Sequence, residues 1–161
     1  MLAQILKPTP ETSYIVSRLL YEKHIYDAVD DRLHDVWHAH IFFRDIERGK
    51  TLVIGVFQKE SNAFLGCVIG DFFDSCFSGH ILFKRKVDVK AAVLLCEEEL
   101  KRYCHDAGIA LREIIGNIPE YNRAALCMAR KAGYMDSGEA VDFTHFKNGK
   151  VVSCRCMRKE I

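Results

Sequence analysis

The amino-acid sequence predicts a single α/β domain with a mixed sheet, in the order β-α-α-β-β-β-α-β-α-β-β. Its 161 residues match the size of one ordinary domain. Hydrophobic residues make up 49% and charged residues 28%, which is the balance of a globular protein. The hydrophobic period switches between that of strands and that of helices, without repeats or a linker. We therefore expect one domain over residues 1–161.

The first third of the chain predicts a strand and two helices. Residues 1–7 form a short strand that ends at a turn containing two prolines, after which Glu11 or Thr12 begins a helix. A second, amphipathic helix is predicted over residues 26–40, because apolar residues line one side and aspartates the other.

The middle of the chain predicts three strands. Residues 51–57 and 63–70 are rich in β-branched and aromatic residues and flank the turn Lys59-Glu-Ser-Asn, which is typical of a β-hairpin. A third strand is predicted over residues 78–86.

A long helix follows from Val89, because its apolar residues recur at steps of three and four, and Gly108 suits its C-terminal cap. Its exposed side is expected to carry the ion pairs Glu97 to Lys101 and Glu98 to Arg102. The remaining predicted elements are a strand over 111–116, a helix over 120–132 and two final strands joined by a tight turn at Asn148-Gly149.

Charge and cysteine content exclude several classes of protein. Lys and Arg total 23 against 22 Asp and Glu, so no overall field attracts nucleic acid or an anionic membrane. No run approaches the roughly 20 apolar residues of a membrane span. Seven cysteines form an odd set, and residues 1–7 are too short for a signal peptide. We expect a cytoplasmic protein without a membrane segment.

Residues 122–134, Asn-Arg-Ala-Ala-Leu-Cys-Met-Ala-Arg-Lys-Ala-Gly-Tyr, carry the clearest motif. Asn122 can cap a helix or hold a ligand amide, Ala125 lets a thin ligand approach, and Gly133 can end the helix in a left-handed turn. A plain amphipathic helix with a glycine stop is the structural alternative.

This run resembles the second conserved helix of the GNAT acetyltransferases, and the resemblance covers about residues 51–158. It implies the GNAT-type acyl-CoA N-acyltransferase fold, a binding site for acetyl-CoA or another acyl-CoA as co-substrate, and transfer of the acyl group to an amine.

The family's other landmark is a strand-loop-helix whose glycines present backbone N–H groups to the pyrophosphate. The corresponding run here lacks those glycines, and Val89 stands where one is expected. Lys84, Arg85, Lys86 and Lys90 could compensate by charge, or could form an ordinary solvated strand end. The cofactor-binding residues that the resemblance implies are Leu82, Phe83, Lys84, Val87, Asp88, Val89, Lys90, Ala91, Asn122 and Ala125.

Acyl transfer needs a deprotonated amine and a proton for the leaving thiolate. The family often supplies the acid as a tyrosine of the second helix, where this chain has Ala129. Tyr134 or Tyr121 could replace it, although a tyrosine near a helix end more often packs. His80 and Glu113 are the candidate bases, with a structural role as the alternative.

Two hypotheses follow, which differ in whether the chain is an enzyme. The first is an acyl-CoA-dependent N-acyltransferase with an unidentified small-molecule or protein amine as acceptor. The second is a catalytically inactive GNAT-fold binding or assembly protein. The chain also resembles small acyltransferase-like proteins of tailed bacteriophages, which would place it in the host cytoplasm with a virion or host protein partner.

The sequence leaves two further features open. The aromatic residues Phe72, Phe73 and Phe77 could line an acceptor cleft, form a homodimer contact or pack in the core. His34 and His38 lie four apart on a predicted helix, but no cysteine or acidic pair accompanies them, so no metal site is predicted.

Overall fold

The computed structural model describes residues 1–26, 36–145 and 151–161. Its elements are β1 (Leu2–Ile5), α1 (Pro10–Leu20), α2 (Lys23–Tyr26), α3 (Val36–Glu47), β2 (Leu52–Phe57), β3 (Phe64–Phe73), β4 (Cys76–Phe83), α4 (Val89–Ala107), β5 (Glu113–Pro119), α5 (Arg123–Lys131), β6 (Met135–His145) and β7 (Val151–Glu160). The predicted mixed α and β architecture is confirmed, with one additional short helix, α2.

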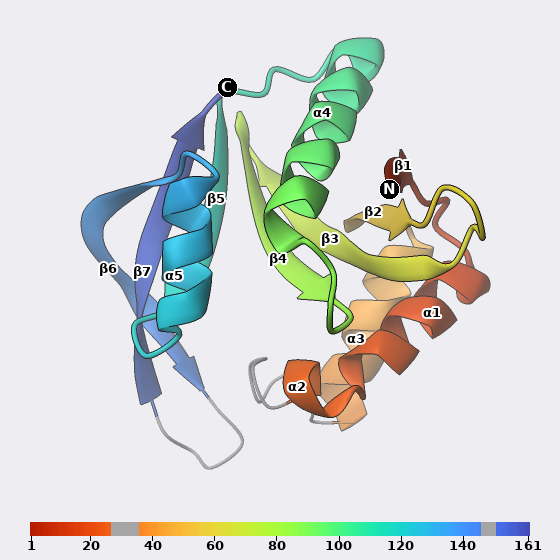
Figure 1. Ribbon diagram of the computed structural model, residues 1–161, viewed down its shortest axis with the longest axis horizontal. Coiled ribbons are helices and arrows are strands. Elements are labelled where there is room, and N and C mark those ends of the chain that lie inside the picture. The colour runs from red at the N-terminus through yellow and green to blue at the C-terminus, as the bar shows by residue number, and fades with distance from the viewer. Residues whose placement is uncertain (27–35, 146–150) are drawn as a thin grey trace.

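The strands form one 7-stranded sheet in the order β1-β2-β3-β4-β5-β7-β6 (Figure 1). The pairs from β1 to β4 and the pairs among β5, β7 and β6 are antiparallel, and β4 pairs with β5 in parallel. The parallel junction therefore joins two antiparallel halves, and α4 makes the crossover between them.

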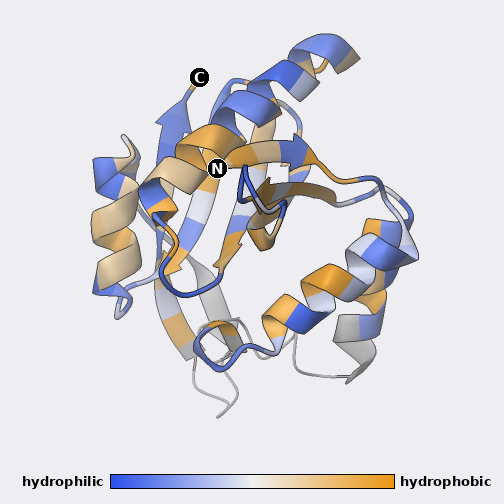
Figure 2. Ribbon diagram, turned by 45° about the vertical axis from the view of Figure 1, so that its right-hand side comes forward, coloured by the Kyte–Doolittle hydropathy of each residue, from blue (hydrophilic) through white to orange (hydrophobic). Residues whose placement is uncertain are grey.

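Helices cover both faces of the sheet. On one face, residues of α1, α2 and α3 pack against Cys67, Ile69 and Leu82. On the other face, α4 packs against residues that include Phe77 and Phe83. Figure 2 shows hydrophobic residues in the N-terminal half of α4 and hydrophilic residues in its C-terminal half. Helix α5 lies beside α4 over the second half of the sheet and packs on β7 (Figure 1).

Capping residues and glycines explain where several helices begin and end. Thr9 caps α1, and Pro10 occupies its first turn. Gly108 ends α4 with a φ of 67°, and Gly133 follows α5 with a φ of 91°, both in the left-handed region that favours glycine. Asn122 caps α5, as its sequence position suggested.

Some predicted boundaries were wrong, and two predictions lie wholly or partly outside the described residues. Most of the helix predicted over 26–40 lies outside the described residues; its described end belongs to α3, which runs from Val36 to Glu47. Strand β4 ends at Phe83, because Lys86 turns the chain toward α4 with a φ of 68°. The predicted turn at Asn148-Gly149 lies outside the described residues.

The three phenylalanines near the tip of the β3–β4 hairpin have different environments. Phe77 is fully buried, and its ring centroid lies 5.1 Å from that of Phe72, which packs against the same core. Phe73 is 63% exposed. Core packing therefore accounts for two of the three. Within the described parts of the chain, no helix is long and apolar enough to cross a bilayer.

Candidate functional site

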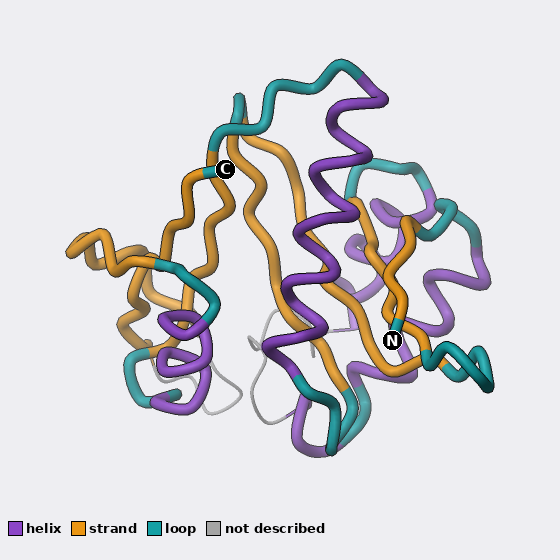
Figure 3. The backbone as a smooth tube through the Cα atoms, turned by 45° about the horizontal axis from the view of Figure 1, so that its top comes forward, coloured by secondary structure: helices purple, strands orange, loops and turns teal. Residues whose placement is uncertain are grey.

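The junction between β4 and β5 is paired at one end only. Its Cα partners are Cys76 with Glu113, Phe77 with Ile114, and Ser78 with Ile115. Beyond these pairs the two strands separate, and Figure 3 shows their tubes diverging. The rest of β4 and β5 therefore has backbone edges that do not pair with each other.

A cavity of about 970 Å³ lies at this opening, and α2, α4 and α5 contribute to it along with the strands. Its lining is mostly apolar with a few polar side chains, which is typical of a small-molecule site. The sequence-predicted site residues that line it are His80, Leu82, Phe83, Val89, Asn122, Ala125 and Tyr134. The lining does not include Lys84, Val87, Asp88, Lys90, Ala91 or Glu113.

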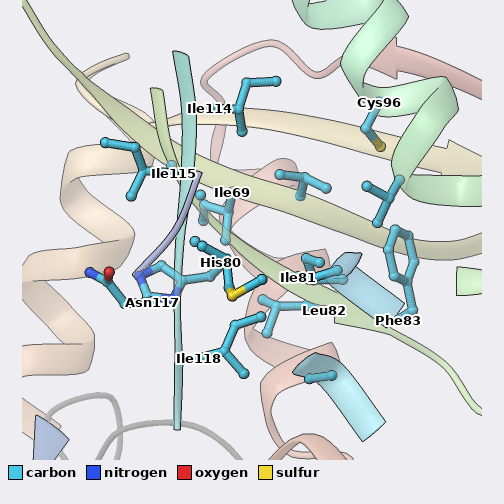
Figure 4. Close-up of a pocket in the computed structure, with 18 of the residues that line it drawn as sticks. Ile69, His80, Ile81, Leu82, Phe83, Cys96, Ile114, Ile115, Asn117 and Ile118 are labelled. Atoms are coloured by element: carbon cyan, nitrogen blue, oxygen red, sulfur yellow. The ribbon is translucent and has the colours of Figure 1, made fainter. Parts of the chain in front are cut away.

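His80 lies on β4 at the start of the opening. Since side chains alternate along a strand, His80 and Asn117 are the next residues after Ser78 and Ile115 on the face that α1 to α3 cover. Figure 4 shows the His80 ring and the Asn117 amide beside one another. An imidazole, a group suited to proton transfer near neutral pH, therefore lines the cavity where the two strands begin to separate.

Glu113 lies at the closed end of the junction, away from the cavity lining. Its Oε2 accepts hydrogen bonds from Arg158 at 3.3 Å and from the Cys76 thiol at 3.5 Å. Burial, followed by the bond to this carboxylate, raises the pKa of the Cys76 thiol. The two predicted bases are thus separated, and only His80 lines the cavity.

Tyr134 lines the cavity from the side of α4 and α5. Burial, and next the Glu97 carboxylate, raise the pKa of its phenol above the usual 10.0. The phenol therefore stays protonated, so it can donate a hydrogen bond but gives up its proton reluctantly.

The N-terminus of α4 is already capped by the chain itself. Asp88 Oδ1 accepts a hydrogen bond from the Ala91 backbone N–H at 3.1 Å. A carboxylate thus occupies the place where a helix N-terminus could bind a phosphate. The exposed side chains of Lys84, Arg85, Lys86 and Lys90 surround this turn. The α4 N-terminus therefore differs from the glycine-rich backbone cradle that the resemblance implies.

At α5, Asn122 Oδ1 accepts a hydrogen bond from the Ala125 backbone N–H at 3.1 Å. Both residues line the cavity, so the small Ala125 leaves room there. Ala129 is 4% exposed and belongs to a small core with Leu126 and Met157. At the position of the family's tyrosine, the chain therefore offers a methyl group and no hydroxyl.

Several polar residues of the cavity were not predicted from the sequence, among them Asn117 and Glu97. Asn117 was detectable as a polar residue in a run of isoleucines. Glu97 was predicted to be exposed and paired with Lys101, which was wrong: it is 5% exposed and pairs with Lys159 of β7. The exposed face of α4 carries the pairs Lys101 with Glu98 and Arg102 with Glu99 instead.

His24, which was not predicted either, lines the cavity from α2, and its Nε2 lies 3.0 Å from the Phe83 carbonyl oxygen. This contact ties α2 to the end of β4. Of the two histidines weighed as metal ligands, His34 lies outside the described residues.

No protein-family model and no curated protein sequence matches the chain. Solved structures do match over nearly its whole length. The ribosomal-protein-S5-alanine acetyltransferase of Vibrio fischeri has a TM-score of 0.71 at 13% identity, and the match covers 99% of this chain and 93% of that one. A GNAT-family acetyltransferase of Streptococcus pneumoniae has a TM-score of 0.66 at 19% identity, with 99% of each chain covered.

The spermidine N-acetyltransferase of Vibrio cholerae, solved in complex with CoA and spermine, has a TM-score of 0.69 at 12% identity, and the match covers 98% of this chain and 95% of that one. At these identities the matches establish architecture alone. The chain has the fold of the GNAT acetyltransferases.

Proposed function

We propose that this chain binds an acyl-coenzyme A and transfers the acyl group to an amine. The observation that carries the proposal is the opening of the sheet between β4 and β5 into a cavity of about 970 Å³, in a chain with the GNAT fold. Structural neighbours with this fold are acetyltransferases, and one was solved with CoA and spermine.

The cavity suits the thin arm of coenzyme A. Its lining is mostly apolar, and the β4 edge beyond Ser78 is not paired with β5, so it offers hydrogen-bonding groups to an extended ligand. Asn122 and Ala125 border this space. The phosphates would be held by side-chain charge around Lys84 and Lys90, because Asp88 caps the α4 N-terminus.

The acyl thioester supplies an activated carbonyl carbon. The amine nitrogen forms a bond to that carbon, and the carbon–sulfur bond breaks. His80 would take the proton that the attacking amine loses. The phenol of Tyr134 would donate a hydrogen bond to the developing negative charge on sulfur, and the thiolate then takes its proton from solvent.

The second possible function has the same fold but no catalysis. It is favoured by the buried Ala129, which replaces the hydroxyl that the family often uses, and by the absence of glycines at the α4 N-terminus. The chain would then be a binding or assembly protein, with a protein partner of the kind that the resemblance to bacteriophage proteins implies.

Thermal melting with acetyl-CoA, followed by an acetylation assay over a panel of amines, distinguishes these functions. Acetyl-CoA at a hundredfold excess over Kd should stabilise the fold by about 2.7 kcal/mol, which raises the Tm by roughly 5 to 10 °C. The substitution Lys90→Glu should remove this shift. Binding together with release of CoA supports the enzyme, binding without turnover supports the second function, and no shift at saturation contradicts acyl-CoA binding.

A further inference from the structure

The lining of the cavity carries one unbalanced charge. Among the described residues it includes two carboxylates, Asp71 of β3 and Glu97 of α4, and no lysine or arginine. Lys159, which lies outside the lining, pairs with Glu97 and balances its charge. Asp71 has neither an ion pair nor a hydrogen bond within the described parts of the chain. The cavity therefore presents the negative charge of Asp71 to whatever enters it.

Asp71 lies beside the point where the sheet opens. Because side chains alternate along a strand, it is on the same face of β3 as Cys67 and Ile69, which is the face that α1 to α3 cover. Its Cα partner is Ser78, the last residue of β4 that pairs with β5. Asp71 is therefore in line with the last closed pair of the β4–β5 junction.

His80 is the diagonal neighbour of Asp71 on this face. The Cα partner of His80 is Ile69, two residues before Asp71, so the side chains of Asp71 and His80 leave the sheet on the same side. Diagonal neighbours on adjacent antiparallel strands lie about 7–8 Å apart. Both side chains are exposed and both line the cavity. A ligand can therefore reach both, and a short carbon chain would bridge them.

The charge of Asp71 restricts the kind of ligand that fits this part of the cavity. An unpaired carboxylate attracts a positively charged group and repels a negatively charged one. An alkylammonium would also donate the charged hydrogen bonds that this carboxylate lacks. An amine that carries its own carboxylate would be repelled.

We infer that the acceptor is an amine with a second, positively charged amino group, and that Asp71 binds this second group. The inference rests on the proposed function, since it specifies the acceptor of the same reaction. With one ammonium at Asp71, the other nitrogen of a short diamine lies beside His80, which takes the proton that this nitrogen loses when it attacks the thioester. Asp71 thus selects the acceptor without taking part in the chemistry.

The test compares three amines of similar length whose far ends are positive, neutral and negative: 1,4-diaminobutane, butylamine and 4-aminobutanoate. Steady-state acetylation with acetyl-CoA gives kcat/KM for each amine. The wild type should prefer the diamine to butylamine by about fivefold, and butylamine to 4-aminobutanoate by a similar factor, as for an ion pair that stays partly in water. Added salt should reduce both preferences, because it screens the charge.

Two variants of Asp71 and one matched control isolate this charge. Asp71→Asn keeps the shape of the side chain, so the three amines should react with similar kcat/KM, and that of butylamine should not change. Asp71→Lys should reverse the order of preference. The control is Asp74→Asn, which removes the same charge from the turn after β3, outside the cavity lining. Asparagine tolerates the φ of 52° at this position, so the control should keep the wild-type preference.

The remaining outcomes contradict the inference in different ways. If the wild type acetylates the three amines equally well, or if Asp71→Asn keeps the preference for the diamine, the inference is wrong while the proposed function stands. If Asp74→Asn also loses the preference, the overall charge of the protein sets it, and the inference is wrong. If the wild type releases no coenzyme A with any amine, the proposed function fails, and the inference fails with it.

Discussion

Asp88 gives a prediction in which fold stability and ligand affinity respond differently. Its carboxylate caps α4 through the 3.1 Å bond from the Ala91 N–H. In Asp88→Asn the amide oxygen can accept the same bond, so the cap is kept and the negative charge is lost. At about 5 Å in a water-like dielectric, a unit charge repels each phosphate charge by about 1 kcal/mol. Coenzyme A should therefore bind about fivefold more tightly, or more if both phosphates are near.

Asp88→Ala separates the two effects, because it removes both the charge and the cap. It should gain the same affinity but lose about 1 kcal/mol of stability, which lowers the Tm by roughly 2 to 4 °C. Glu98→Gln is the matched control. Its exposed carboxylate lies 10 residues along α4, or about 15 Å, which exceeds the screening length at physiological salt.

Calorimetric titration with coenzyme A at constant ionic strength measures the affinities, and thermal melting without ligand measures the stabilities. If Asp88→Asn binds coenzyme A no more tightly than the wild type, the pyrophosphate does not sit at the N-terminus of α4, and the placement of the phosphates near Lys90 must be abandoned.

Three further outcomes are expected. His80→Gln should lower the rate of acyl transfer about 10²- to 10⁴-fold in a steady-state assay while leaving coenzyme A affinity unchanged, and an unchanged rate would exclude His80 as the base. Burial raises the pKa of the Cys67 and Cys96 thiols above the ordinary 9.0. Above pH 9 these thiols lose their protons in the unfolded chain but keep them in the folded one. The free energy of unfolding, measured by urea titration, should therefore fall above pH 9 by about 1.4 kcal/mol per thiol per pH unit. A free energy of unfolding that does not change above pH 9 would contradict this prediction. Gly70→Ala should lower the free energy of unfolding by several kcal/mol and therefore unfold at a lower urea concentration, because the new Cβ would lie 2.2 Å from a backbone oxygen of β4. Gly116→Ala, which has open space around its Cβ, should unfold at the same urea concentration as the wild type.

The fold was predictable from the sequence wherever a local rule applied. The period of apolar residues located the β2–β3 hairpin and α4, and capping residues located Gly108 and Asn122. The end of β4 was not predictable, because Lys86 takes up a left-handed conformation without being a glycine.

The candidate site was predictable only in part. Motif positions identified Asn122 and Ala125, and both line the cavity. The sequence grouped His80 with Glu113, but the parallel register puts Glu113 at the closed end of the junction and His80 just beyond the last paired residues, where the opening starts. Asn117 lies beside His80 because two strands separated by a helix come into the same register (Figure 4).

By itself, the sequence determined the class of fold and the helix caps at Gly108 and Asn122, because these depend on residues close together in the chain. Only the tertiary structure decided which polar groups share a cavity. Glu97 shows the reason: on the helix alone it reads as an exposed partner of Lys101, but packing of α4 against β7 buries it and gives it Lys159, 62 residues away. Burial by residues that are distant in the sequence changes which partners a charged side chain can have, and the local sequence pattern does not indicate this burial.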